Sequence, residues 1–270
     1  MEEKYEQILS SEVSPLIPFE LLDEYNDFIN PTLREVLRAN CLRRYLEGAI
    51  DLLIKTKIIQ VASISEKQWD GLKLYKKIEK IREFYSTDIA DAFDELRRIG
   101  NPGSHFGNEV SKDDINKGID VATRIVEMVL IEYFKTYPAG SQAPVLTLLS
   151  ALPPRNRIYI WEKILENGQN DLWVTDKLSM AYLKNGQYER SISFLGKQKS
   201  IGIISEEEYE NFVQKIDMLY RNLDRFDIAQ NILDVKRIFE TIASSPTYQH
   251  YKEFVNIFLV LVSGYNLGSA

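Results

Sequence analysis

Hydrophobic positions recur every three or four residues through most of the chain, which predicts an all-α protein built from amphipathic helices. The clearest helix is predicted over residues 32–55. Its expected inward side chains are Leu33, Val36, Leu37, Cys41, Leu46, Ile50 and Leu53. The opposite face is either an ordinary solvated surface or a basic wall beside a functional site, because it carries Arg34, Arg38, Arg43, Arg44 and Glu47.

Further periodic segments complete the first half of the chain. Ser86 to Asp88 and Ser111 stand where helix N-caps are wanted. Gly100 stands where a left-handed residue would end a helix at Ile99. The pattern therefore predicts a bundle of four or five helices, with the further members at about residues 19–29, 72–85, 89–99 and 113–137.

A single stretch rich in proline, glycine and serine, residues 138–144, marks a domain boundary. It separates a predicted helical bundle at 1–137 from a second helical domain at 145–270. The second domain contains a weak repeat, in which residues 181–195 align with 219–233. The two copies resemble the helix-turn-helix of tetratricopeptide repeats. We expect a short array of helical hairpins there and no long solenoid.

The composition narrows the classes of function. The chain has 270 residues, of which 44% are hydrophobic, and its net charge of -7 disfavours broad binding of duplex DNA. Its one cysteine, Cys41, is expected to be a small core residue. With only two histidines beside it, we expect no metal site and no cofactor.

The N-terminus is acidic and lacks an apolar run, so no signal peptide is predicted. The most apolar stretch, residues 254–262, is too short for a membrane span of about 20 residues. We therefore expect a soluble, cytoplasmic protein that makes no contact with a membrane.

The candidate chemistry gathers between two of the predicted helices. Arg97 and Arg98 close one helix, and Gly100 and Pro102 are expected to break it. His105 follows on a glycine-flanked turn. A permanent cation and a titratable imidazole on one turn suit phosphate chemistry, in which arginine holds the anion and histidine moves protons. The same pair could instead staple the end of a helix.

This stretch resembles a HEPN domain. Arg98, six intervening residues and His105 match the Arg-x(4–6)-His signature of that family. The surrounding residues also resemble the R-x-x-G-N-x-x-x-H stretch of a HEPN-like family of bacterial domains. Segments 42–50 and 74–84 resemble two helices of the same family, so the resemblance covers roughly residues 15–137.

The resemblance implies a helical bundle that forms a homodimer and cuts RNA without a metal, with the 2′-hydroxyl as the nucleophile. Arg98 would then stabilise the charged phosphate in the transition state, and His105 would act as general acid or base. Asn101 and Ser104 would orient the phosphate or the imidazole. Arg97 would be either a second phosphate contact or a plain surface charge.

Two functions follow from these observations. The first is a HEPN-type, metal-independent RNA endonuclease or RNA-binding effector of a bacterial defence or toxin–antitoxin system. The second is a non-catalytic dimeric interaction module, whose C-terminal helical region binds a protein partner. The Arg98–His105 pattern favours the first. The excess of acidic over basic residues in 1–137 and the hairpin repeat after residue 145 favour the second. Ile99, where active nucleases commonly have a polar residue, argues against catalysis.

Overall fold

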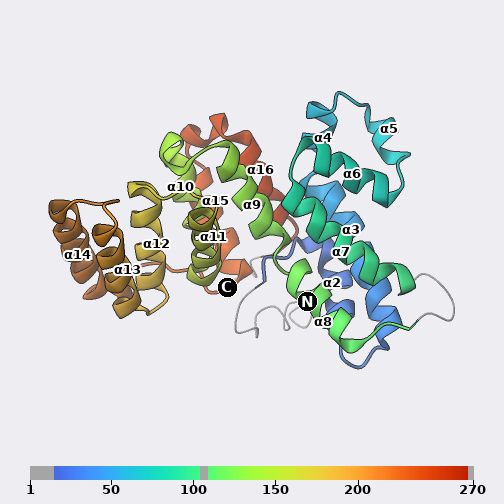
Figure 1. The fold of residues 1–270 in the computed structure, drawn as a ribbon, viewed down its shortest axis with the longest axis horizontal. Helices are drawn as coiled ribbons and strands as arrows, with labels where there is room; N and C mark the ends of the chain where they lie inside the picture. Colours follow the sequence, from blue (N-terminus) through green and yellow to red (C-terminus); the bar gives the residue numbers. More distant parts are fainter. Residues whose placement is uncertain (1–14, 104–108, 267–270) are drawn as a thin grey trace. The chain divides into compact units, whose positions relative to one another are not determined.

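The computed structural model describes residues 15–103 and 109–266 (Figure 1). Fifteen α-helices, α2 to α16, and a few short 3-10 helices form within these residues, and they contain no β-strand. The predicted all-α class is confirmed. None of the helices described is both long and apolar enough to cross a membrane.

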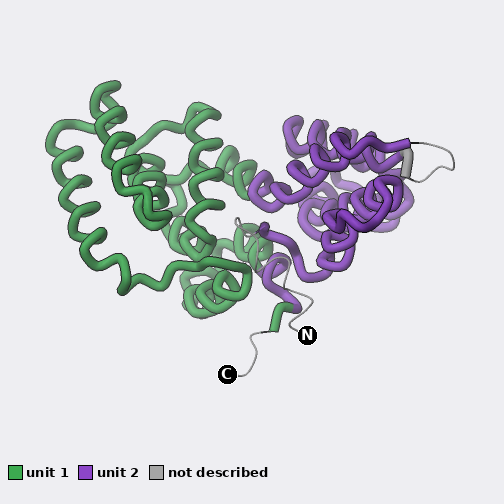
Figure 2. The backbone as a smooth tube through the Cα atoms, turned by 90° about the horizontal axis from the view of Figure 1, so that it is seen from below, with its two compact units in different colours: residues 1–14, 130–258, 265–270 green, residues 15–129, 259–264 purple. Residues whose placement is uncertain are grey.

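The chain divides into two compact units (Figure 2). We call residues 15–129 with 259–264 the bundle unit, and residues 130–258 with 265–266 the hairpin unit. The division falls within α9 (Ile125–Thr136) and α16 (Lys252–Val262). The boundary predicted from the composition lies later, at 138–144, in a stretch that contains η3 (Ala139–Ser141) and the start of α10 (Ala143–Leu149). Pro144 fits there because the first turn of a helix tolerates proline.

The bundle unit is built around one long central helix, α3, which packs against α2, α7 and α8, while α6 packs against α7. The short helices α4 and α5 are not indicated by the hydrophobic pattern. The helices of this unit are α2 (Leu22–Ile29, preceded by η2 at Phe19–Leu21), α3 (Glu35–Leu53), α4 (Lys55–Val61), α5 (Glu66–Asp70), α6 (Leu74–Phe84), α7 (Thr87–Gly103) and α8 (Lys112–Ala122).

The buried face of α3 differs from the predicted one. Leu37 is 43% exposed, and Cys41 is only half-buried, so the prediction of a core cysteine is wrong. The Cys41 Sγ atom lies 3.8 Å from Asp27 Oδ2. Ala39 and Ala49 are fully buried instead. Their small side chains allow the neighbouring helices to pack closely against α3.

Contrary to the prediction from the sequence, Arg38 does not lie on a basic surface of α3 but is buried. Its side chain is buried, at 7% exposure, and its Nε donates to the Phe28 carbonyl at 2.8 Å. This bond gives a donor to a carbonyl in the last turn of α2, where the helix itself supplies none. Arg44 is bound separately, to Glu24 at 2.6 Å. The arginines of α3 therefore form neither one solvated face nor one continuous basic wall.

Both predicted N-caps are confirmed. Ser86 Oγ accepts from the Ile89 amide at 3.3 Å, and Ser111 Oγ accepts from the Asp114 amide at 3.0 Å. The helix expected at 113–137 is instead two helices, α8 and α9. Between the two helices, the Thr123 hydroxyl donates to the Ile119 carbonyl at 2.9 Å. This side-chain bond to the backbone competes with the hydrogen bonds of a continuous helix.

In the hairpin unit, α11 to α14 pack each against the next along the chain (Figure 1). Its aromatic core contains Phe134, Trp161, Phe239, Phe254 and Phe258. Besides α10, the helices of this unit are α11 (Pro154–Glu166), α12 (Leu172–Lys184), α13 (Tyr188–Ser200), α14 (Glu206–Tyr220) and α15 (Ile232–Ala243), with η4 (Leu223–Arg225) and η5 (Pro246–His250).

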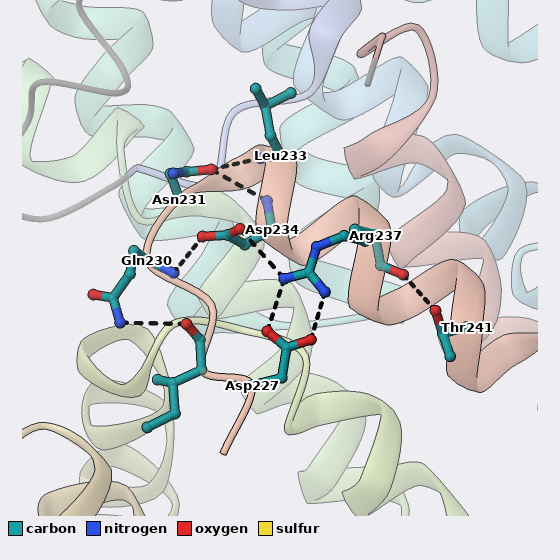
Figure 3. Close-up of polar contacts among 8 residues, drawn as sticks. Asp227, Gln230, Asn231, Leu233, Asp234, Arg237 and Thr241 are labelled. Atoms are coloured by element: carbon teal, nitrogen blue, oxygen red, sulfur yellow. Dashed lines mark hydrogen bonds and ion pairs between the residues drawn. The ribbon is translucent and has the colours of Figure 1, made fainter. Parts of the chain in front are cut away.

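The two stretches aligned as a repeat differ in local structure. In the first, α12 turns tightly into α13 through Gly186, whose φ of +73° lies in the left-handed region that glycine favours. In the second, η4 and a non-helical segment separate α14 from α15. A hydrogen-bonded network holds that segment (Figure 3). Arg237 on α15 bonds both carboxylate oxygens of Asp227, and Asn231 caps α15 by accepting from two backbone amides.

Candidate functional site

The candidate site lies at the C-terminal end of α7. Gly100 is buried there in helical conformation, with no positive φ. A methyl group at Gly100 would lie 2.6 Å from the Cβ of Arg43 and 3.2 Å from the Ala39 carbonyl oxygen. The helix continues to Gly103, so the prediction that Gly100 and Pro102 break it is wrong. Glycine is needed here for the close approach of α3 to α7, and not for a left-handed turn.

Asp94 organises the two arginines of the motif. Arg97 Nε donates to Asp94 Oδ1 at 2.8 Å, and Arg98 Nε lies 3.3 Å from Asp94 Oδ2. The Arg97 side chain is 24% exposed, whereas that of Arg98 is 68% exposed. The guanidinium of Arg98 is therefore largely exposed, whereas most of the Arg97 side chain is covered beside Asp94.

Asn101 is tied to the central helix. Its Oδ1 accepts from Arg43 Nη1 at 3.0 Å, and Arg43 Nε also bonds Glu47 at 3.1 Å. Within the residues that the structure describes, Arg43 is thus the arginine of α3 that bonds the end of α7. The hydrogen bond from Arg43 fixes the orientation of the Asn101 side-chain amide, three residues after Arg98 in the sequence.

A pocket of about 220 Å³ opens beside Arg98. Ile99 and Val110 contribute to it, together with the carboxylates of Glu95, Glu109 and Asp114. Three carboxylates around one arginine lower the local affinity for phosphate and favour a cationic group. Among the residues that the structure describes, no group of histidine, cysteine, aspartate or glutamate side chains is arranged to hold a metal ion.

Part of the predicted site has no described geometry. Ser104 and His105 lie outside the described residues. Arg97, Arg98 and Asn101 all lie near the C-terminal end of α7, and Arg43 from α3 bonds Asn101 there. The pocket carboxylates Glu109 and Asp114 were not predicted as site residues. Asp114 carries a visible sequence signal only as a capping residue of α8, and the sequence around Glu109 gives none.

Comparison with known proteins found one similarity, and it falls on the region that contains the candidate site. Residues 34–149 match the family described as a domain of unknown function (DUF4145). The match includes the Arg98 stretch and the helix that carries Arg43, and it covers less than half of the chain. No curated protein and no solved structure matches the chain. The similarity is therefore to a family that is defined by sequence and has no assigned activity.

Proposed function

We propose that the protein is a HEPN-type effector that acts on RNA, as a metal-independent endonuclease or an RNA-binding protein of a bacterial defence or toxin–antitoxin system. The observation that carries the proposal is the exposed guanidinium of Arg98 at the end of α7. Arg98 sits in the sequence context Arg-x6-His with His105. An accessible arginine is what a phosphodiester requires as a partner.

In the proposed reaction, Arg98 binds the non-bridging oxygens of the phosphate and stabilises the charge that develops on them. The 2′-hydroxyl attacks the adjacent phosphorus while His105 accepts its proton or protonates the leaving 5′-oxygen. The P–O5′ bond breaks, which leaves a 2′,3′-cyclic phosphate and a 5′-hydroxyl. Pairing of two protomers would bring two Arg98–His105 sets to one cleft.

Purified full-length protein incubated with total RNA and a chelator tests this proposal. We expect cleavage by the wild type and its loss in Arg98→Ala and His105→Ala. Arg82→Ala is the matched control, because Arg82 is an exposed arginine of the same unit that also pairs with one aspartate, Asp91. Equal cleavage by all four proteins, or no cleavage and no RNA binding by the wild type, would contradict the proposal.

A second function has its own observation in favour of it. The carboxylates of Glu95, Glu109 and Asp114 around Arg98 suit a non-catalytic dimeric module better than a nuclease. In that function the pocket receives a basic group, and the C-terminal helical region binds a protein partner.

Neutralising the pocket separates the two functions. The double variant Glu95→Gln/Glu109→Gln should bind RNA more tightly than the wild type if RNA is the ligand, because repulsion of phosphate is removed. If the protein is an interaction module, neither the wild type nor the double variant should bind RNA. Both should then have the mass of a dimer in light scattering. A monomer mass for the wild type would contradict the dimer in both functions.

A further inference from the structure

A second charged pocket lies entirely within the hairpin unit. It has a volume of about 180 Å³ and is formed by residues of α10, α11, α12 and α14. Four cationic side chains contribute to it, Arg157, Lys177, Lys184 and Lys215. All four cations lie outside the residues of the DUF4145 match, and the proposed action on RNA does not use them.

Arg157 is the deepest of the four cations. Its side chain is buried, at 6% exposure, on the apolar stripe of α11 that also carries Trp161 and Ile164. Within the described chain no carboxylate pairs with it, and its Nε atom has no hydrogen-bond partner. Burial lowers the pKa of Arg157 to about 10. A buried arginine without a counter-charge is costly, and such a group is normally paired.

Lys184 adds to the excess of positive charge. Burial, followed by the neighbouring charges of Arg157 and Lys177, lowers the pKa of Lys184 to about 8. Its Nζ lies 5.2 Å from the centre of the Phe226 ring, and no carboxylate of the described residues pairs with it. The aromatic ring offsets only a small part of the charge.

One carboxylate serves the remaining cations. Asp176 bonds Lys177 at 2.9 Å and Lys215 at 2.5 Å. Those two ion pairs offset part of the charge of Lys177 and Lys215, but within the described residues Arg157 and Lys184 have no carboxylate partner. The pocket therefore has a net positive charge, which comes from side chains on the three helices α11, α12 and α14.

We propose that this pocket binds the dianionic phosphate group of a small ligand. The multiple cations favour a doubly charged anion over a single carboxylate. The space exceeds one phosphate group, and Leu146, Leu149 and Met180 supply apolar surface for a compact substituent. The phosphate comes either as free inorganic phosphate or as a phosphate monoester, and both satisfy the same cations.

Calorimetric titration of the full-length protein in phosphate-free buffer tests the site. The probes are inorganic phosphate, phenyl phosphate and benzoate. We expect phosphate or phenyl phosphate to bind, and benzoate to bind at least about tenfold more weakly, because charge-assisted bonds to a dianion are lost. If phenyl phosphate binds more tightly, the ligand of the pocket is a phosphate monoester. If inorganic phosphate binds more tightly, the ligand is the free ion.

Three variants connect binding to the pocket. Arg157→Met and Lys184→Met should each weaken phosphate binding about tenfold or more. Lys199→Met is the control, because Lys199 pairs with Glu206 at 3.1 Å and does not line the pocket. Arg157→Met should also melt at the same or a higher temperature without ligand, because an unpaired buried charge is removed. A purely structural Arg157 would lower that temperature.

Several results would overturn the site. They are no binding of either phosphate probe at millimolar concentration, equal binding of benzoate, or equal affinity in Lys184→Met and Lys199→Met. Lys184 is only half-buried, so its variant gives a decisive answer even if Arg157→Met fails to fold. The RNA cleavage of the wild type is measured separately, so failure of the RNA proposal leaves this test unaffected.

Discussion

Gly100 on α7 lies directly against Arg43 on α3, with no room between them for a side chain. A methyl group at Gly100 would be 2.6 Å from Arg43 Cβ and 3.3 Å from Arg43 Cα. Arg43 also holds Asn101 through its Nη1. Helix packing in the bundle unit and the placement of the motif residues therefore depend on the same contact.

Gly100→Ala should destabilise the protein by about 1–3 kcal/mol through overpacking, although alanine is the better helix former. The atoms it would meet belong to the backbone and Cβ of α3 and cannot rotate away. Thermal unfolding measures the effect. Gly196→Ala on α13 is the matched control, since nothing lies within 4 Å of the added methyl. It should stabilise by about 0.5–1 kcal/mol. Equal effects at the two glycines would contradict the close contact.

Arg38→Met should destabilise the protein by about 1–3 kcal/mol, because the buried Phe28 carbonyl loses its donor. Chemical denaturation measures the loss. Arg44→Met serves as the comparison, because Arg44 is an exposed arginine of the same helix paired with Glu24. Its loss should cost about 0–1 kcal/mol. Similar losses for both variants would place Arg38 at the surface, contrary to the structure.

The lowered pKa of Lys184 should make the free energy of unfolding depend on pH. Burial and the charges of Arg157 and Lys177 hold its folded-state pKa at about 8, below the ~10.4 of a free lysine. Between these values the unfolded chain binds the proton more tightly than the folded chain. The contribution of Lys184 to the free energy of unfolding therefore rises as pH increases from about 8 to about 10.

Lys184→Met isolates that contribution. In phosphate-free buffer it should melt higher than the wild type at pH 7, and the difference should shrink by pH 10. The charged groups facing Lys184 are Arg157 from α11, Lys177 from α12 and Lys215 from α14, and all are retained in this variant. A difference that stays constant across this range would show that Lys184 titrates like an exposed lysine.

Local signals in the sequence were sufficient for the elements whose causes are local. The N-caps at Ser86 and Ser111 depend on one side chain and the amide three residues later, and both form as predicted. The break at Thr123 was missed because the apolar periodicity continues across it, while the competing bond comes from one hydroxyl.

Features set by tertiary packing were not predictable in the same way. Gly100 looks like a helix C-cap until α3 is placed beside it. Arg38 looks solvated until the end of α2 presents the Phe28 carbonyl. For Arg157 a usable signal existed, because it falls in phase with the apolar residues Trp161 and Ile164. An arginine in that phase indicates a buried cation that needs a partner.

In the proposed function, Arg98 and His105 cut RNA with the RNA's own 2′-hydroxyl as the nucleophile. The most direct measurement compares cleavage of an RNA oligonucleotide with cleavage of the same oligonucleotide carrying 2′-deoxy sugars, both with a chelator present. We predict that the wild type cuts only the RNA and leaves 2′,3′-cyclic phosphate ends, and that His105→Ala cuts neither. Cleavage of both substrates, or products that carry a 5′-phosphate, would contradict the claim.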